Sequence, residues 1–419
     1  MSFDRRTVIK GAAAAAATLA LPAHVGRAQS GKKISILTWN IPDQADLING
    51  WIKAFQEKHA GVEVEWLDKK GPELPTFYQT QLVAGTPPDI INTQGALWLE
   101  YAANGALQDL TPFIQSDPEL KDRFNKDYLA NWAYEGKNYM FPFYITKTLL
   151  FWNKTMFKEA GLSGPPQTFD QVMEYASKMA GGEKTGLVTL NFDWLFWPLF
   201  AANKIDLLSP DMKRAVFNTP QAQELVARLA KATETGAINK VSWTGRWVEN
   251  NGAFAAGNVG MHHAHSPAFF FIRGQGKWVN PDTLGAAHFP GGWSTPNSHG
   301  LGISKGSKNP ELAYEFLKMI TNDQWTKRFA TERKVLTGNT KTDLAVLQEM
   351  KATDPLAEQV LRTQIEMTDK LVGNWPIALD SQVKEAFFPE LQSALLGRVS
   401  AKDALTEAER KVNRVLRRA

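Results

Sequence analysis

Aromatic and polar side chains gather where two predicted strands end. The strands are predicted over 33–39 and 89–92, because both runs are apolar, are rich in β-branched residues and are followed by polar residues. The residues at or just beyond their ends are Trp39, Asn40, Asp43, Gln44, Thr93 and Gln94. A flat indole face suits the C–H face of a sugar ring, and a side-chain amide both donates to and accepts from neighbouring hydroxyls. These positions indicate a site for a hydroxylated ligand, with helix capping as the alternative role of Asp43.

The elements around these residues follow an alternating pattern. Apolar residues recur at helical spacing over 43–58 and alternate with acidic residues over 62–66, and a second helix is predicted over 74–84. Strand, helix, strand, helix and strand predict an α/β domain with a largely parallel sheet. In such sheets ligands lie beyond the carboxyl ends of the strands, which is where the aromatic and polar residues occur.

The rest of the chain is also mixed in its patterns. The stretch 139–153 is aromatic and rich in β-formers, and Ser400 with Asp403 forms a predicted capping box. Further helices are predicted over 169–179, 221–235, 310–320 and from Ser400 onward.

Composition excludes several classes of protein. The chain of 419 residues has no cysteine, so disulfides and thiol chemistry are excluded, and an exported chain of this kind needs a large core, here expected in two domains. The net charge is +4, but residues 1–28 carry most of that excess, and the remainder is close to neutral. That balance argues against a nucleic-acid binder. The 14 tryptophans are compatible with sugar stacking, although most are expected in the core.

The first 28 residues have the order of a secretory signal. A charged start is followed by an apolar run of alanine and leucine and by the small residues Gly26 and Ala28, so cleavage is expected before Gln29. Arg5 and Arg6 resemble a twin-arginine export signal, the alternative being an ordinary secretory signal with two arginines. No other segment is long and apolar enough for a predicted membrane span.

Motifs for other chemistries are missing or incomplete. The sequence has no P-loop and no G-x-S-x-G nucleophile motif. His263 and His265 would share one face of a strand while His262 points away, and no clustered cysteine or acidic residue completes a metal set. We therefore expect no metal and no cofactor.

Six stretches occur in order along the chain: I-S-I-L-T-W, W-I-K-A-F-Q-E-K-H-A-G-V-E-V, A-G-T-P-P-D-I-I-N-T, G-K-N-Y-M-F-P-F-Y-I-T-K-T-L-L-F-W-N-K-T-M-F-K-E-A-G-L, F-A-A-G-N-V-G-M and S-K-N-P-E-L-A-Y-E-F-L-K-M-I-T. In these stretches the chain resembles a known family, the bacterial extracellular solute-binding proteins of the maltose-binding type, which serve ABC sugar importers. Tyr144, Leu149 and Trp152 depart from the usual family residues but keep apolar character.

The resemblance implies an α/β, two-lobe periplasmic-binding-protein fold with a hinge. It places the N-terminal lobe at 29–143 and 297–340, and the C-terminal lobe at 144–296 and 341–419. It also implies further ligand contacts, with core packing as the alternative for each: Tyr144, Asp193, Trp194, His265, Ser266, Gly292, Trp293 and Trp375. Trp197 is expected in the core.

The resemblance further implies a periplasmic, monomeric binding protein without enzymatic activity. It would deliver a sugar, glycoside or short oligosaccharide to an ABC permease driven by a separate ATPase. One alternative is a receptor for an anionic sugar derivative held by Arg246 and the Gly291–Gly292 backbone. The other is a secreted carbohydrate-active enzyme, which would require two opposed carboxylates that the sequence does not identify.

Overall fold

The computed structural model describes residues 32–39, 41, 44–70, 73–94, 97–124, 126–190, 193–366 and 379–418. The strands are β1 (Lys33–Trp39), β2 (Glu63–Lys69), β3 (Ile90–Gln94), β4 (Ala133–Tyr134), β5 (Lys137–Asn138), β6 (Met140–Asn153), β7 (Thr185–Val188), β8 (Val259–His265), β9 (Leu284–Ala287) and β10 (Pro296–Ile303). The first helices are α1 (Ala45–Lys58), α2 (Glu73–Val83), α3 (Leu97–Ala103), α4 (Thr111–Ser116), α5 (Pro118–Lys121), α6 (Lys126–Ala130), α7 (Lys154–Glu159), α8 (Phe169–Met179) and α9 (Asp193–Ala202). They are followed by α10 (Pro220–Glu234), α11 (Trp247–Ala255), α12 (Ala268–Gln275), α13 (Pro310–Ile320), α14 (Asp323–Arg333), α15 (Thr340–Thr353), α16 (Pro355–Glu366), α17 (Asp380–Leu395) and α18 (Ala401–Leu416).

The main sheet has the order β2-β1-β3-β10-β6-β8-β7, and β9 also pairs with β6. The predicted parallel pairing is found between β1 and its neighbours β2 and β3, and between β7 and β8. The expectation of a largely parallel sheet is wrong at its centre, where β10 is antiparallel to both β3 and β6. The reason is that β6 leads from one half of the molecule to the other and β10 returns in the opposite direction.

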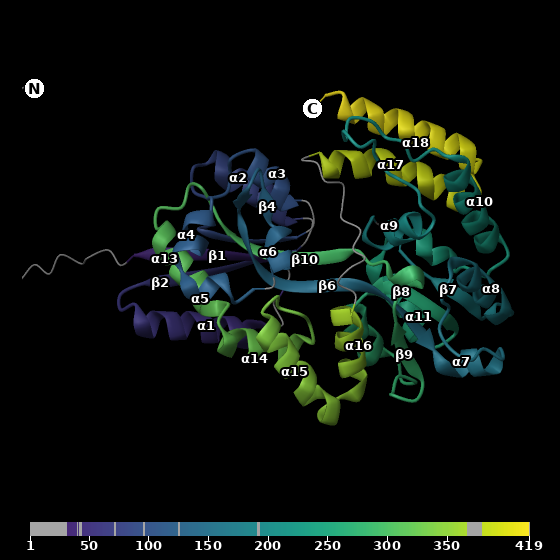
Figure 1. Cartoon of the computed structure of the whole chain (residues 1–419), viewed down its shortest axis with the longest axis horizontal. Coiled ribbons are helices and arrows are strands. Elements are labelled where there is room, and N and C mark those ends of the chain that lie inside the picture. The colour runs from purple at the N-terminus through teal and green to yellow at the C-terminus, as the bar shows by residue number, and fades with distance from the viewer. Residues whose placement is uncertain are drawn as a thin grey trace, which may run out of the picture.

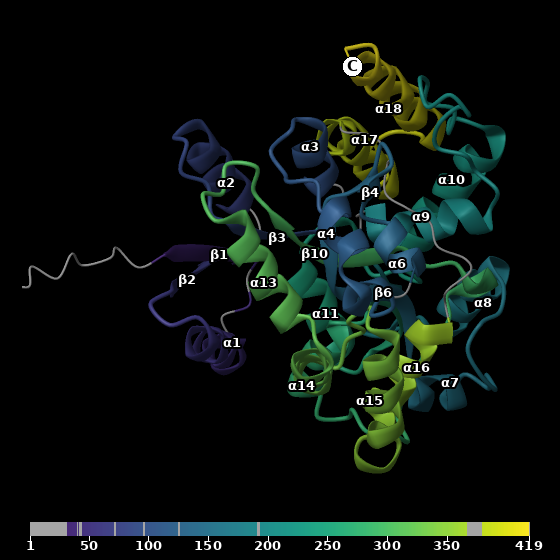
Figure 2. The same ribbon diagram turned by 60° about the vertical axis from the view of Figure 1, so that its left-hand side comes forward.

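The long strand β6 belongs to both halves of the molecule. Its residues from Met140 to Lys147 pair with β10, whereas those from Thr148 to Asn153 pair with β8 or β9. Figure 1 shows the consequence: β1, β2 and their helices form one group, β7, β8 and β9 form another, and β6 and β10 run between the two. Figure 2, from a second direction, shows β1, β2 and α1 on one side of β6 and α7, α8 and α10 on the other.

Each half of the sheet is covered by apolar residues on both faces. In the first half, α1 buries Leu47, Ile48, Trp51 and Phe55, which are the residues of the predicted helical stripe. In the second half, α17 and α18 pack over α10, and the predicted core position of Trp197 is confirmed because its side chain is fully buried. Ser400 Oγ accepts a hydrogen bond from Asp403 N at 3.1 Å, so the predicted cap of α18 is present.

Within the described ranges, no helix is long and apolar enough to cross a bilayer.

Candidate functional site

The candidate site is the point in the sheet where β6 changes partners. Across the strands, Gln94 of β3 pairs with His299 of β10, and His299 pairs with Tyr144 of β6. Four residues further along β6, Thr148 pairs with His265 at the end of β8. The pairing of β6 with β10 and β8, and of β10 with β3, therefore places the predicted residues Gln94, Tyr144 and His265 in one continuous sheet.

His299 lies between two of the predicted aromatic residues. Its ring stacks on Tyr144 with centroids 4.1 Å apart and planes inclined by 16°. Trp39 approaches the same imidazole edge-on, with centroids 6.3 Å apart. Trp39 is itself fixed by its backbone N–H, which donates to Asn92 Oδ1 at 3.2 Å, while Asn92 Nδ2 donates to the backbone oxygen of Gly300 at 3.0 Å. This arrangement ties the end of β1 to β3 and β10.

The second histidine, His265, is held by the neighbouring strand. Its Nδ1 lies 2.9 Å from Thr146 Oγ1, and both residues are buried. Thr148 anchors the approach to β10, because its Oγ1 lies 3.1 Å from Ser294 Oγ and accepts from Thr295 N at 3.0 Å. The hydroxyls of β6 therefore fix both β8 and the segment that precedes β10.

A buried lysine completes the junction. Lys147 Nζ donates to the backbone oxygen of Gln364 at 2.7 Å and lies 5.6 Å from the centroid of the Tyr128 ring. Gln364 is in the last turn of α16, where a cation is favourable. Gln364 Oε1 accepts from Ser266 Oγ at 2.8 Å and from Lys147 N at 3.3 Å. This cluster connects β6, the residue after β8 and the end of α16.

Burial keeps both histidines neutral at physiological pH. Removal from water lowers the pKa of His299 to about 3, and Arg333 adds a smaller effect in the same direction. Removal from water also lowers the pKa of His265 well below its usual value, with smaller contributions from His263 and His299. A neutral imidazole offers one N–H donor and one acceptor nitrogen, which suits a hydroxyl better than an anion.

The other predicted residues differ in how they lie. Thr93 is fully buried next to Gln94 in β3, and Gln44 is the buried residue that precedes α1. Trp293 is half-buried two residues before Thr295, and its ring lies against Gly291. Of these three, Thr93 lies beside the junction, because it pairs with Gly300 of β10.

Two parts of the predicted anion site are not arranged for that role. Arg246 is exposed and its Nη1 donates to Glu249 Oε1 at 2.7 Å, so its charge is already compensated. The expectation of exposed backbone N–H groups at Gly291–Gly292 is wrong for Gly292, whose N–H donates to Phe289 O at 2.8 Å. Gly291 and Gly292 both have positive φ angles, and the resulting tight turn directs that N–H back into the chain.

Several predictions lie outside the described residues. These are Asn40, Asp43, Trp375 and the side chains of Asp193 and Trp194, although Asp193 begins α9. The cluster at Gln364 fixes the described chain just before the segment 367–378 that contains Trp375.

The sequence did not single out Thr146, Lys147, His299 or Gln364. Thr146 and Lys147 are polar residues inside the largely apolar stretch G-K-N-Y-M-F-P-F-Y-I-T-K. That interruption is the sequence feature that could have marked them as site residues. The roles of His299 and Gln364 depend on pairing with residues more than 90 positions away, which local patterns do not reveal.

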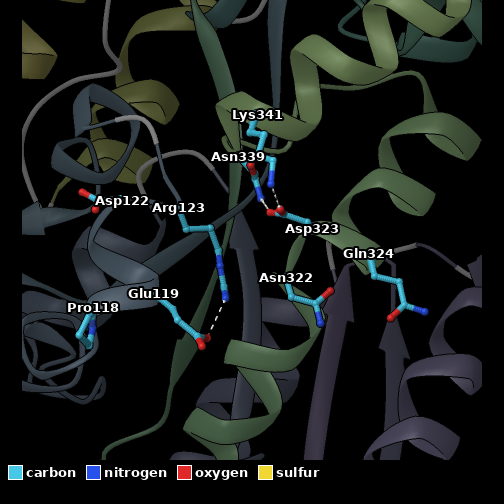
Figure 3. A pocket seen from close by; sticks show the side chains of 9 residues that line it. All are labelled: Pro118, Glu119, Asp122, Arg123, Asn322, Asp323, Gln324, Asn339 and Lys341. Atoms are coloured by element: carbon cyan, nitrogen blue, oxygen red, sulfur yellow. Dashed lines mark hydrogen bonds and ion pairs between the residues drawn. The ribbon is translucent and has the colours of Figure 1, made fainter.

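A separate groove of about 520 Å³ lies beside the start of α14 and α15 (Figure 3). Two of its charged groups already have partners within the protein. Asp323 accepts from Asn339 Nδ2 at 2.8 Å and from Lys341 Nζ at 2.9 Å. Arg123 donates to Lys318 O at 2.8 Å and to Thr321 Oγ1 at 3.2 Å. Among the described residues, no group of three or more His, Cys, Asp or Glu side chains is placed to hold a metal ion.

A family model identifies the chain. The model for the bacterial extracellular solute-binding proteins matches residues 39–327, which is more than half of the chain and includes β6, β8 and β10. The chain belongs to this family. Members of this family are binding proteins. The family resemblance found in the sequence is therefore confirmed.

Individual relatives agree on the fold. The diacetylchitobiose binding protein of Streptomyces coelicolor is 24% identical over 329 residues, covering 72% of this chain and 71% of the relative. An oligosaccharide periplasmic-binding protein from Synechococcus sp. MITs9220 superposes with a TM-score of 0.81 at 22% identity, covering 92% and 99% of the two chains. An ABC substrate-binding protein from Listeria monocytogenes, in complex with cycloalternan, gives 0.78 at 20% identity, covering 91% and 98%. The predicted two-lobe α/β fold is confirmed.

Proposed function

We propose that this solute-binding protein captures a neutral sugar, glycoside or short oligosaccharide at the junction of β6 and β10 and delivers it to an ABC permease. The observation that carries the proposal is the stack of Tyr144 and His299 beside Trp39. Aromatic faces with neutral donors and acceptors beside them suit a polyhydroxylated ring. Relatives of the same fold are described as binding diacetylchitobiose, oligosaccharides and cycloalternan, which supports this ligand class.

The ligand would lie between two lobes. We assign 29–143 with 297–340 to the first lobe and 144–296 with 341–419 to the second. The change of partner along β6 after Lys147 supports this division, because a hinge requires few strands that cross between lobes. Closure of the lobes over a sugar would remove the ligand from water and fix its orientation.

The remaining contacts are assigned from the sequence. In this proposal Asn40, Asp43, Asp193, Trp194 and Trp375 complete the site from segments outside the described side chains. Further contacts to the ligand are assigned to six residues around them: Gln44, Thr93, Gln94, Ser266, Gly292 and Trp293.

Export and assembly belong to the same proposal. The twin arginines and the apolar run in 1–28 support export to the periplasm and cleavage before Gln29. We further propose that the mature protein acts as a monomer without catalytic activity or a cofactor, and that a separate ATPase drives the permease. The absence of a P-loop motif from the sequence supports the separate ATPase.

The neutral ligand is favoured over an anionic sugar derivative by the state of the candidate anion contacts. Arg246 is paired with Glu249, and Gly292 N–H donates within the turn. The pKa of His299 is lowered to about 3, so its ring is uncharged at neutral pH. A carbohydrate-active enzyme would require paired carboxylates, and the described residues named above at the junction include none.

The test is a calorimetric titration with neutral mono-, di- and tetrasaccharides and with phosphorylated monosaccharides. Saturating binding of a neutral saccharide with no turnover supports the proposal, and stabilisation by about 2.7 kcal/mol is expected at 100 times the dissociation constant. Binding of the phosphorylated sugars alone, or release of hydrolysis products, would refute it.

A further inference from the structure

A local excess of basic residues lies at one edge of this protein. After Glu409 the chain contains Arg410, Lys411, Arg414, Arg417 and Arg418 and no acidic residue, whereas the stretch 29–397 is net acidic. These five bases lie at the C-terminal end of α18, at the outer edge of the molecule in Figure 1 and away from the junction of β6 and β10.

The helix presents its bases on one side. Residues three and four apart lie on the same face of a helix, so Arg410, Arg414 and Arg417 form a row. Arg410 is ion-paired with Glu407, and the neighbouring Lys411 is ion-paired with Glu390, so neither is counted as a free charge. The opposite face of α18 buries Leu405, Ala408 and Val412 against its neighbours, which fixes the orientation of the row. Arg414, Arg417 and Arg418 are exposed.

A short turn extends this surface beside α18. Leu208 and Ala215 form a bridge, Ser209 N donates to Arg214 O at 2.8 Å, and Met212 N donates to Ser209 O at 2.8 Å. At its tip Met212 has a φ of 58° and is 45% exposed, with Lys213 next to it. Met212 is preceded by the exposed Asp211 and followed by Lys213 and Arg214, so the tip carries two bases and one acid beside its apolar side chain. An exposed apolar side chain beside an excess of bases is the composition of an interfacial contact with lipid headgroups.

The turn and the helix form one rigid unit. Asn413 Oδ1 of α18 accepts from Ala215 N at 2.9 Å, and Glu409 accepts from Asn218 N at 3.1 Å. Asn218 Nδ2 also donates to Thr406 Oγ1 at 3.2 Å. The surface is therefore preorganised and loses little entropy when a partner binds.

We propose that Met212, Lys213, Arg214, Arg414, Arg417 and Arg418, here called the α18 basic surface, adsorb the protein to an anionic phospholipid bilayer. Charge complementarity favours a lipid headgroup layer, and Met212 adds a small apolar contact at its boundary. A protein partner would instead be expected to contact aromatic anchors, and the described side chains of this surface include none. Adsorption of this kind would hold a binding protein near membrane-embedded machinery, and it does not depend on which ligand the junction binds.

The first experiment measures binding of the mature protein, residues 29–419, to vesicles of equimolar phosphatidylcholine and phosphatidylglycerol, because the basic and apolar leader 1–28 would itself bind such vesicles. Each base near an anionic surface strengthens binding by roughly fivefold, so Lys213→Gln, Arg414→Gln, Arg417→Gln and Arg418→Gln together should weaken it by roughly six-hundredfold. Wild-type binding should also fall between about 50 mM and about 300 mM salt, because salt screens the attraction.

A matched variant removes the same charge from the other side of the molecule. Lys53, Lys58, Lys308 and Lys351 are exposed on or near α1, α13 and α15, and their combined change to glutamine should leave vesicle binding unchanged. Met212→Asn, which tolerates the positive φ, should weaken binding roughly fivefold without changing its dependence on salt. Circular dichroism and thermal melting confirm that each variant is folded.

Three outcomes overturn the proposal. The first is equal binding of the wild type and the fourfold α18 variant, and the second is equal weakening by the matched lysine variant. The third is binding to pure phosphatidylcholine vesicles as strong as to anionic ones. Transport can also be measured with a permease reconstituted in phosphatidylcholine alone. If the fourfold α18 variant binds vesicles as the wild type does but loses transport in that system, the surface binds a protein partner instead of lipid.

Discussion

Tyr144 and His299 stack with ring centroids 4.1 Å apart, although 155 positions of sequence separate them. The contact exists because β6 and β10 run antiparallel through the centre of the sheet. It places a tyrosine ring and a neutral imidazole on two strands that both pass between the halves of the molecule. A ligand bound against this stack would contact both strands at once.

Replacement of His299 by phenylalanine should separate stacking from hydrogen bonding. The ring would still stack on Tyr144, while the nitrogen atoms that a hydroxyl could use are lost. We expect the dissociation constant for the identified saccharide to rise about tenfold or more, measured by calorimetry. The unliganded protein should melt at the same temperature or higher, because His299 Nδ1 has no hydrogen-bond partner among the described residues and is buried.

A matched control is available on β8. His263 is buried and stacks on Phe289 with centroids 4.2 Å apart, and its Nε2 likewise has no partner among the described residues. His263→Phe should therefore leave saccharide affinity unchanged. Equal affinity losses in the two variants would show that His299 acts through general packing.

Gln364 should be a main determinant of stability at the junction. Gln364→Ala removes the acceptor used by Ser266 Oγ and Lys147 N and leaves both donors buried. We expect the free energy of unfolding to fall by about 2–3 kcal/mol, measured by urea denaturation without ligand. Ser266→Ala removes one donor only and should cost about 1 kcal/mol. A loss for Gln364→Ala no larger than that for Ser266→Ala would contradict this role.

Stability should fall as the pH drops below about 6.5. Burial lowers the pKa of His262 to about 4 and lowers the pKa values of His263 and His299 to about 3. Between these values and 6.5 the unfolded chain binds more protons than the folded one, so acid favours unfolding. Each group contributes up to about 1.4 kcal/mol per pH unit, and the loss is complete once the pH has passed the folded pKa.

Asp343 opposes this trend. Burial raises its pKa to about 6, against the smaller opposing effect of hydrogen bonds from Thr337 and Gly338. Its contribution to stability is present below pH 4 and is lost as the pH rises through about 6. Asp343→Asn should therefore make the acid-induced loss steeper between pH 4 and 6, measured by urea denaturation at several pH values. An unchanged slope would show that Asp343 does not titrate in this range.

Local patterns predicted the elements better than the site. The stripe Leu47, Ile48, Trp51 and Phe55 specifies α1 because helical periodicity is a local property. The contact between Thr146 and His265 depends on the register of β6 against β8, and that register is set by the packing of the whole second half. Gly292 was misjudged because two consecutive positive φ angles direct its N–H into the turn, which composition alone does not reveal.

Export should depend on the paired arginines. Arg5→Lys with Arg6→Lys keeps the charge of the leader but removes the guanidinium groups of a twin-arginine signal. We expect precursor to accumulate in the cytoplasm, measured by fractionation and immunoblotting. A variant with Lys10→Arg keeps the pair and serves as a control that should be exported normally. Normal export of the double lysine variant would assign the protein to the general secretory route.

Trp375 should bind the sugar and contribute little to folding. It lies in G-N-W-P-I, where Gly373 and Pro376 indicate a bent loop, eleven positions after the Gln364 cluster that fixes the end of α16. Loss of a stacking ring costs on the order of 2 kcal/mol, so Trp375→Ala should weaken saccharide binding roughly thirtyfold, measured by calorimetry, while Trp375→Phe should retain part of the affinity.

Trp243 is the control for this last prediction, because its side chain is fully buried and its Nε1 donates to Thr233 Oγ1 at 2.8 Å. Trp243→Phe should lower the melting temperature of the unliganded protein and leave affinity per folded molecule intact. Trp375→Ala should therefore lower affinity without lowering the melting temperature, and Trp243→Phe should do the reverse. If Trp375→Ala lowers the melting temperature and keeps the dissociation constant, Trp375 belongs to the core, and the aromatic contribution to binding rests on the other proposed rings, Trp39, Tyr144, Trp194 and Trp293.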